Sequence, residues 1–278
     1  MPVKLRAALF ALVAGIACPV SLEAQTPPTG TATPAPVLVL GADDVQKGYA
    51  AVKRGAYDEA MADFQRAAAV GNADAEAAIG FLYAAGDGVA KDRAESLRWD
   101  RRAAEHGSAL AQLNLGWCYT NGDGVPQDDV EALRWYRLAA AQNNPFALQN
   151  VGAAYMGGHG VAQDYAEAVH WFLRAAALGN PGSQANLGQL YFLGKGVPQD
   201  YALAMKWSRQ AADQAPAWAH YPEPAVERNI AGAQYMVGYL YANGLGTAQD
   251  LAQARDWMTK AAAQGNANAI DWLRTNPQ

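Results

Sequence analysis

The residue types that most often carry out chemistry are few and scattered in this chain. His106, His159, His170 and His220 are the four histidines, and no two share the i, i+4 spacing that places metal ligands on one helix face. The chain also contains no HExxH, SxxK or GxSxG motif. We therefore predict no catalytic residue, no metal site and no cofactor, and we expect the protein not to be an enzyme.

Glycine pairs are the next candidates for chemistry, because a Gly-x-Gly sequence can hold phosphate where it joins a strand to a helix. The pairs are Gly86/Gly88, Gly122/Gly124, Gly158/Gly160, Gly194/Gly196 and Gly244/Gly246. Each follows a helical pattern rather than a strand. We therefore predict turns with positive φ, not phosphate-binding loops.

Cysteine leaves two interpretations open. Cys18 lies in the N-terminal segment that we expect to be removed, so Cys118 stands alone in the mature chain. A lone cysteine within a helical pattern is typical of a small buried apolar residue. The alternative is a reactive or intermolecular thiol.

Aromatic residues recur with a fixed spacing that identifies the elements around these turns. The tryptophans are 36 residues apart, with one final interval of 50, at Trp99, Trp135, Trp171, Trp207 and Trp257. Tyr83, Tyr119, Tyr155, Tyr191 and Tyr241 keep the same register. A period of this length predicts a stack of two-helix units rather than one globular core.

Residues 108–143 show the pattern of one unit most clearly. Its first half has a single apolar helical stripe, formed by Ala111, Leu115, Gly116 and Tyr119. After the turn, Asp128 and Glu131 have the spacing of a capping box at the start of a second helix. The inner stripe of that helix is Ala132, Trp135, Ala139 and Ala140.

A glycine also recurs in the middle of each first helix, at Gly80, Gly116, Gly152, Gly188 and Gly238. Such a glycine costs about 1 kcal/mol relative to alanine. Its repetition at one phase predicts a close backbone approach between neighbouring helices. The tryptophans are expected to fill the space between units, each burying on the order of 200 Å².

Together these residues resemble the Sel-1-like repeat, a relative of the tetratricopeptide repeat. The resemblance implies an all-α fold, a right-handed α-solenoid of antiparallel helix pairs. The five repeats within 72–265 are 72–107, 108–143, 144–179, 180–215 and 230–265. Residues 43–71 resemble a tetratricopeptide-like capping unit, and residues 266–278 are expected to form a C-terminal capping helix at about 267–275.

A 14-residue insertion at 216–229 interrupts the period. Pro216 is expected to end one helix, and Pro224 to extend the next first helix towards its N-terminus. Trp218, His220 and Tyr221 are then predicted on an exposed loop. This loop is either a tolerated insertion or a contact element beside the groove.

The N-terminus has the features of a secretory signal. Lys4 and Arg6 precede an apolar run, and residues 1–24 are predicted to be removed. Residues 25–42 form a Pro/Thr-rich disordered linker. We expect a periplasmic or secreted protein. One alternative is anchoring as a lipoprotein through Cys18, and another is that residues 1–24 form a buried N-terminal helix.

Charge limits the partners. Removal of Lys4, Arg6 and Glu23 leaves 19 basic and 25 acidic residues, a net charge of −6. Because no basic cluster is present, we predict no nucleic-acid partner and no attraction to anionic membranes. No integral membrane segment is expected after removal of the signal.

The outward positions of the first helices form the candidate binding site. Helical phase predicts an apolar, aromatic and uncharged strip there, consisting of Phe81, Leu113, Trp117, Phe146, Gln149, Gln189, Phe192, Tyr235 and Tyr239. A contiguous apolar surface usually marks an interaction site. The alternative is that the superhelix closes over these side chains and buries them.

We therefore predict a non-catalytic protein-protein interaction scaffold, expected to be a monomer, that binds a protein or peptide partner in its concave groove. The alternative is a cell-envelope enzyme, or a protein that binds glycan or peptidoglycan. The resemblance extends to cysteine-rich relatives linked to β-lactam hydrolysis. Those relatives have a cysteine pair in each unit, and this chain has none, so that activity does not carry over.

Overall fold

The computed structural model describes residues 41–213 and 224–276, and all regular structure within these ranges is α-helical. The thirteen helices described are α2 (Ala42–Arg54), α3 (Tyr57–Ala69), α4 (Ala73–Ala85), α5 (Arg93–Glu105), α6 (Ala109–Asn121), α7 (Asp129–Ala141), α8 (Pro145–Gly157), α9 (Tyr165–Ala177), α10 (Pro181–Leu193), α11 (Tyr201–Asp213), α13 (Pro224–Asn243), α14 (Leu251–Ala263) and α15 (Ala267–Thr275). This confirms the predicted all-α solenoid of helix pairs.

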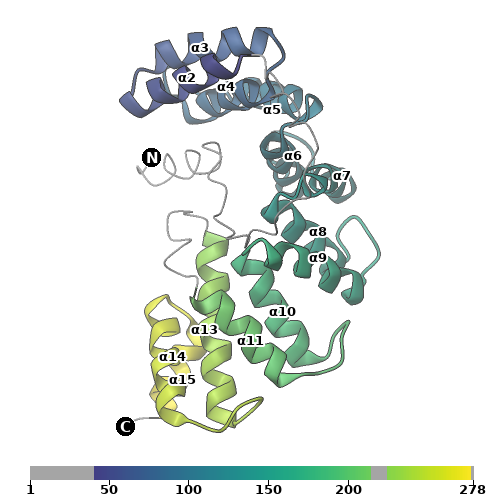
Figure 1. The fold of residues 1–278 in the computed structure, drawn as a ribbon, viewed down its shortest axis with the longest axis vertical. Helices are drawn as coiled ribbons and strands as arrows, with labels where there is room; N and C mark the ends of the chain where they lie inside the picture. Colours follow the sequence, from purple (N-terminus) through teal and green to yellow (C-terminus); the bar gives the residue numbers. More distant parts are fainter. Residues whose placement is uncertain (1–40, 214–223, 277–278) are drawn as a thin grey trace, which may run out of the picture. The chain divides into compact units, whose positions relative to one another are not determined.

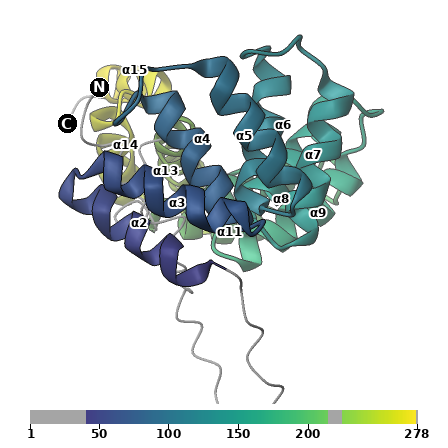
Figure 2. The ribbon, with the colours of Figure 1, turned by 90° about the horizontal axis from the view of Figure 1, so that it is seen from above.

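The helices belong to two compact units, one up to Ala111 and one from Gln112 onward. In the first unit, α2 packs on α3, α3 on α4, and α4 on α5 (Figure 2). In the second unit the pairs are α8–α9, α10–α11 and α13–α14 (Figure 1). In the second unit α7 also contacts α8, α9 contacts α10, α11 contacts α13 and α14 contacts α15. We call the interface between two consecutive repeats a seam.

An aspartate caps the N-terminus of the second helix in every repeat. Its Oδ1 accepts a hydrogen bond of 2.9–3.0 Å from the backbone N–H three residues later, at Asp92, Asp128, Asp164, Asp200 and Asp250. The backbone N–H of the same aspartate donates to the carbonyl of the recurrent tyrosine nine residues earlier, at 2.9–3.0 Å. The predicted N-caps are thus confirmed.

The other half of the predicted capping box is wrong. It required Glu131 to reach back to the N–H of Asp128, but Tyr119 already accepts from that N–H. Glu131 instead accepts from Arg134 at 2.6 Å. The hydrogen bond from Arg134 lowers the pKa of the Glu131 carboxyl.

The first helices are capped by residues that the sequence analysis did not single out. A side-chain oxygen of Asn72, Ser108, Asn144, Asn180 and Asn266 accepts from the backbone N–H three residues later. The residue before each cap has a φ of 59–93°, at Gly71, Gly107, Asn143, Gly179 and Gly265. Asparagine tolerates this conformation better than most residues, which explains why it can replace glycine at 143.

Each mid-helix glycine admits a side chain from the second helix of its own repeat. A Cβ on Gly152 would lie 2.7 Å from the Phe172 ring, and one on Gly116 would collide with the Tyr136 ring. The facing residue is always 20 positions later, and it is Asp100, Tyr136, Phe172, Ser208 or Met258. The predicted close backbone approach is found at Gly80, Gly188 and Gly238, where a carbonyl oxygen of the second helix would lie 3.2–3.4 Å from the Cβ. At Gly116 and Gly152 an aromatic ring takes this space instead.

The Gly-x-Gly turns all have the predicted positive φ, between 63 and 76°. The second glycine of a turn also packs against the previous repeat. A Cβ on Gly160 would collide with the carbonyl oxygen of Asp129, which begins α7. Gly196 and Gly246 have the same relation to Tyr165 and Tyr201, which begin α9 and α11. These glycines therefore let backbone meet backbone across the seams.

The recurrent tryptophans differ in burial. Trp135 and Trp257 are buried, whereas Trp99, Trp171 and Trp207 are half-buried. A cation from the same helix lies 4.0–5.4 Å from each ring centre: Arg102, Arg134, Arg174, Lys206 and Lys260. Such contacts stabilise by about 0.5–1 kcal/mol at exposed sites. The rings thus pack inward on one face and against a cation on the other.

One polar pair recurs within a repeat, between a buried residue of the first helix and an exposed residue at the end of the second helix. Gln142 donates to Gln112 at 2.9 Å, and Gln264 donates to Gln234 at 2.6 Å. In the first repeat the equivalent residue is Glu76, which is fully buried. Its carboxylate lies 2.6 Å from Nε of Arg102 and 2.8 Å from Nδ1 of His106.

Two sequence predictions about the ends of elements are confirmed. Helix α13 begins at Pro224, and the closing helix α15 spans Ala267–Thr275. Cys118 is buried, as expected of an apolar filler. The predicted signal segment, the linker up to residue 40, and Trp218, His220 and Tyr221 lie outside the described residues. Within the described ranges, no helix has both the length and the apolar character needed to span a bilayer.

The two glycines of one turn provide a test of the backbone contact. Gly158→Ala adds only the strain of a positive φ, about 1–2 kcal/mol, because the nearest atom to its Cβ would be 3.4 Å away. Gly160→Ala adds similar strain and also the collision with Asp129. We expect Gly160→Ala to lower the free energy of unfolding by at least about 1 kcal/mol more, as overpacking does. Urea unfolding followed by circular dichroism measures this, and equal losses for the two variants would contradict the contact.

The Glu76 cluster provides a second test. Arg102→Ala should lower the free energy of unfolding by about 3–5 kcal/mol, because it leaves a buried carboxylate without its arginine. Adding Glu76→Gln should recover most of this loss, since glutamine already occupies the equivalent positions 112 and 234. The comparison is between the denaturation midpoints of the single and double variants. A double variant no more stable than Arg102→Ala would show that the charge of Glu76 is not what the arginine compensates.

Candidate functional site

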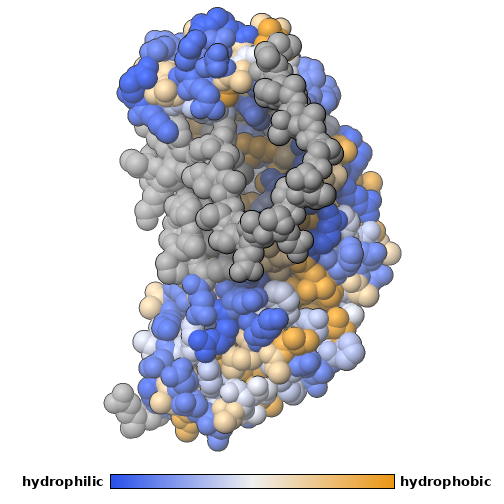
Figure 3. Space-filling model, viewed as in Figure 1, coloured by the Kyte–Doolittle hydropathy of each residue, from blue (hydrophilic) through white to orange (hydrophobic). Residues whose placement is uncertain are grey.

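The predicted partner-binding residues all lie on first helices and none of them is fully buried. Trp117, which is 51% exposed, and Gln189 are exposed. The half-buried members are Phe81, Leu113, Phe146, Gln149, Phe192, Tyr235 and Tyr239. Phe81 belongs to the compact unit that ends at Ala111, and the other eight belong to the unit from Gln112 onward. Figure 3 shows apolar surface over α8 and α10, among mostly polar side chains.

Three of these residues form an aromatic cluster in the C-terminal part of the strip. The ring centres of Phe192 and Tyr239 lie 5.8 Å apart in an edge-to-face arrangement, and those of Tyr239 and Tyr235 lie 6.2 Å apart. The Phe192 ring also contacts Tyr201, at 5.5 Å. Burial raises the pKa of the Tyr235 phenol, and the nearby Tyr239 adds to this effect. The sequence analysis missed Tyr201, because it begins a second helix.

Gln149 has a packing role that the sequence analysis did not predict. A Cβ on Gly182 of α10 would lie 2.7 Å from the amide of Gln149 and 2.7 Å from that of Asn229. Side chains from α8 and α13 therefore converge on the same glycine of α10. Gln149 thus packs between helices, which agrees with its half-buried side chain.

Trp117 differs from the other tryptophans of the described ranges. Six of these seven rings are faced by an arginine or lysine, including Trp272 by Arg255 at 5.9 Å. Trp117 has no such cation among the described residues. It is also the most exposed aromatic side chain among the large hydrophobic residues of the strip. Its outer face is therefore available for a partner.

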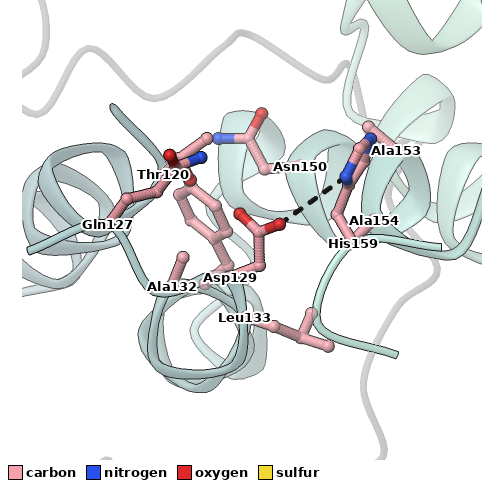
Figure 4. Close-up of a pocket in the computed structure, with 10 residues that line it drawn as sticks. Thr120, Gln127, Asp129, Ala132, Leu133, Asn150, Ala153, Ala154 and His159 are labelled. Atoms are coloured by element: carbon pink, nitrogen blue, oxygen red, sulfur yellow. Dashed lines mark hydrogen bonds and ion pairs between the residues drawn. The ribbon is translucent and has the colours of Figure 1, made fainter. Parts of the chain in front are cut away.

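A pocket of about 230 Å³ lies at the seam between the second and third repeats (Figure 4). We call it the seam pocket, and it is lined by Thr120, Gln127, Asp129, Ala132, Leu133, Tyr136, Asn150, Ala153, Ala154 and His159. These residues come from α6, α7, α8 and the two turns beside them. This pocket was not predicted from the sequence.

The seam pocket contains an acid–imidazole pair. Oδ2 of Asp129 lies 3.7 Å from Nδ1 of His159, and Figure 4 shows the carboxylate pointing towards the ring. A Cβ on Gly157 would collide with that ring, so glycine makes room for it. His159 lies in the turn after α8, at the edge of the pocket.

The hydroxyl groups of the pocket are already engaged. Thr120 donates to the carbonyl of Gly116 at 2.9 Å, and its Oγ1 lies 3.1 Å from the Tyr136 hydroxyl. Thr120 is thus held by its own helix rather than presented to His159 as a nucleophile. Among the described residues, no group of three or more histidine, cysteine or acidic side chains is arranged to hold a metal ion. The geometry suits hydrogen bonding and charge pairing with a bound group.

Comparison with known proteins places these features in a family. The chain matches the Sel1 repeat over residues 73–108, 109–144, 145–180, 181–216 and 231–266, each one residue later than the repeats assigned from the sequence. No curated protein matches the chain.

Two solved structures are similar over most of the chain. A Sel1 repeat protein from Oxalobacter formigenes is 36% identical, with a TM-score of 0.70, and the match covers 82% of this chain and 88% of that one. A protective antigen present in uropathogenic Escherichia coli strains, which displays an SLR fold, is 34% identical with a TM-score of 0.56. That match covers 75% of this chain and 50% of the antigen. From the five matched repeats and this similarity, the chain belongs to the Sel1 repeat family.

Proposed function

We propose that this protein is a non-catalytic scaffold that binds a peptide or protein partner through the first helices of the unit from Gln112 onward. The observation that carries this proposal is Trp117, a large aromatic side chain that is 51% exposed on a first helix. Tryptophan is enriched among the residues that dominate binding energy at protein interfaces. The engaged hydroxyl of Thr120 gives no support to the alternative of an enzyme.

The half-buried aromatic cluster would then border the contact rather than anchor it. Part of the surface of these rings is already buried in contacts between Phe192 and Tyr239 and between Tyr239 and Tyr235. Residues around a hot spot usually contribute by excluding water. Trp117 is thus the member of the strip with the most surface left to bury.

The proposal includes export to the periplasm or secretion. A basic start, an apolar run and a neutral tail at residues 1–24 support removal of a signal peptide. Residues 25–42 would then link the mature N-terminus to the capping unit at 43–71. N-terminal sequencing of the periplasmic fraction should find a chain that begins near Gln25.

Trp117→Ala tests the binding surface. The partner is first identified by crosslinking the mature chain in periplasmic extract, and its affinity for purified variants is then measured by calorimetry. We expect Trp117→Ala to weaken binding by about 1 kcal/mol or more, as truncation of an interface anchor does. Folding should hardly change, because the side chain is exposed.

Val130→Ala is the matched control. Val130 is 67% exposed but lies on the second helix α7, so its loss should leave binding unchanged. Equal effects of the two substitutions would argue against a surface on the first helices. Capture that disappears once glycan is removed from the extract would favour the glycan-binding alternative.

A further inference from the structure

The seam pocket is open because three repeat-related positions carry small or polar residues at this seam. These positions are Thr120, Asp129 and Ala153 between the second and third repeats. At the next seam the same positions carry Met156, Tyr165 and Gln189. At the last seam they carry Phe192, Tyr201 and Tyr239.

Larger residues occupy this space at the two seams that follow. Met156 and Tyr165 pack against the buried cluster around Phe172. Phe192 contacts Tyr201 at 5.5 Å and Tyr239 at 5.8 Å. The backbones approach each other in the same way at these three seams, since Gly160, Gly196 and Gly246 make equivalent close contacts. The pocket is thus a consequence of side-chain choice and not of a local change of fold.

The charge of the pocket is also specific to this seam. At the next seam, Nζ of Lys195 lies 5.0 Å from the centre of the Tyr165 ring. His159 and Asp129 take the places of Lys195 and Tyr165. A carboxylate is thereby introduced, and the lysine is replaced by an imidazole that is charged only when protonated. Within the described ranges no lysine or arginine pairs with Asp129, whose side chain is 35% exposed.

We propose that the seam pocket binds the side chain of a basic residue, arginine or lysine, from a peptide partner. The cationic group would face Asp129, the amides of Gln127 and Asn150 would offer hydrogen-bond acceptors, and Leu133 and Ala153 would contact the aliphatic stem. A volume of about 230 Å³ lies below the roughly 300–1,000 Å³ of pockets for whole small ligands, so it suits one side chain.

Trp117 supports the same partner chemistry. It lies one helical turn before Thr120, on the same side of α6, and its ring lacks the cation that the other described tryptophans have. A peptide with basic residues could supply that cation. The excess of acidic over basic residues in the chain favours such a partner. The inference thus deepens the proposed function, on which the choice of a peptide as partner rests.

The test uses Nα-acetyl-arginine amide as the probe and Nα-acetyl-citrulline amide as its uncharged counterpart. Each is titrated into the full mature chain, and the NMR shifts of the Asn150 and Gln127 side-chain amides and of the Ala153 amide are followed. We expect the arginine probe to move these signals and to bind at least about ten-fold more tightly than the citrulline probe. Equal binding of the two probes, or no shift at these residues, would overturn the proposal.

Variants separate the pocket from general charge effects. Asp129→Asn should weaken binding of the arginine probe at least about five-fold, whereas Asp256→Asn, which removes one exposed carboxylate on α14, should not change it. Thr120→Phe with Ala153→Tyr should abolish binding, because the rings of Phe192 and Tyr239 contact each other at the equivalent positions of the last seam. Folding of this double variant is checked by circular dichroism. A folded double variant that binds the probe like the wild type would contradict the proposed site.

These experiments separate a failure of the pocket inference from a failure of the proposed function. If the arginine probe fails to bind while partner binding depends on Trp117, the pocket inference fails and the scaffold proposal stands. If the probe binds at the pocket while Trp117→Ala leaves partner binding unchanged, the surface proposed on the first helices fails and the pocket remains.

Discussion

The contact between a turn glycine and the first residue of the preceding second helix is the constraint on which the stack depends. At Gly160, Gly196 and Gly246 the backbone of one repeat touches the backbone of the repeat before it, and no side chain fits between them. The same glycines need a positive φ, so two requirements select one residue type. Everything else at a seam, including the aromatic rings and the seam pocket, is arranged around this fixed distance.

Much of the fold could be predicted because its determinants are local in sequence. The aspartate caps, the turn glycines and the closing helix each follow from a few neighbouring residues whose spacing repeats. The capping box failed for a tertiary reason, since the tyrosine carbonyl of the first helix takes the N–H that Glu131 would need. Glu76 was missed because its partners, Arg102 and His106, lie a full helix away.

The candidate site could be predicted only in part. Helical phase correctly placed the strip on the first helices, but phase alone cannot show that Phe192 and Tyr239 face each other and Trp117 faces outward. The seam pocket is lined by residues from three helices, and it is open because some of these residues are small. The apolar pattern of a single helix shows neither fact. The sequence does contain one indication of the pocket, because Thr120, Asp129 and Ala153 are smaller than their counterparts at the two seams that follow.

The backbone contact at the turns has a consequence for how such proteins diversify. Because that contact is made by backbone atoms alone, the side chains that fill each seam can change without altering the path of the chain. A seam between repeats can therefore be filled or left open by the choice of residues at three positions, as at 120, 129 and 153. Repeats of nearly identical shape can thus evolve different ligand preferences, because the side chains at each seam determine what binds there.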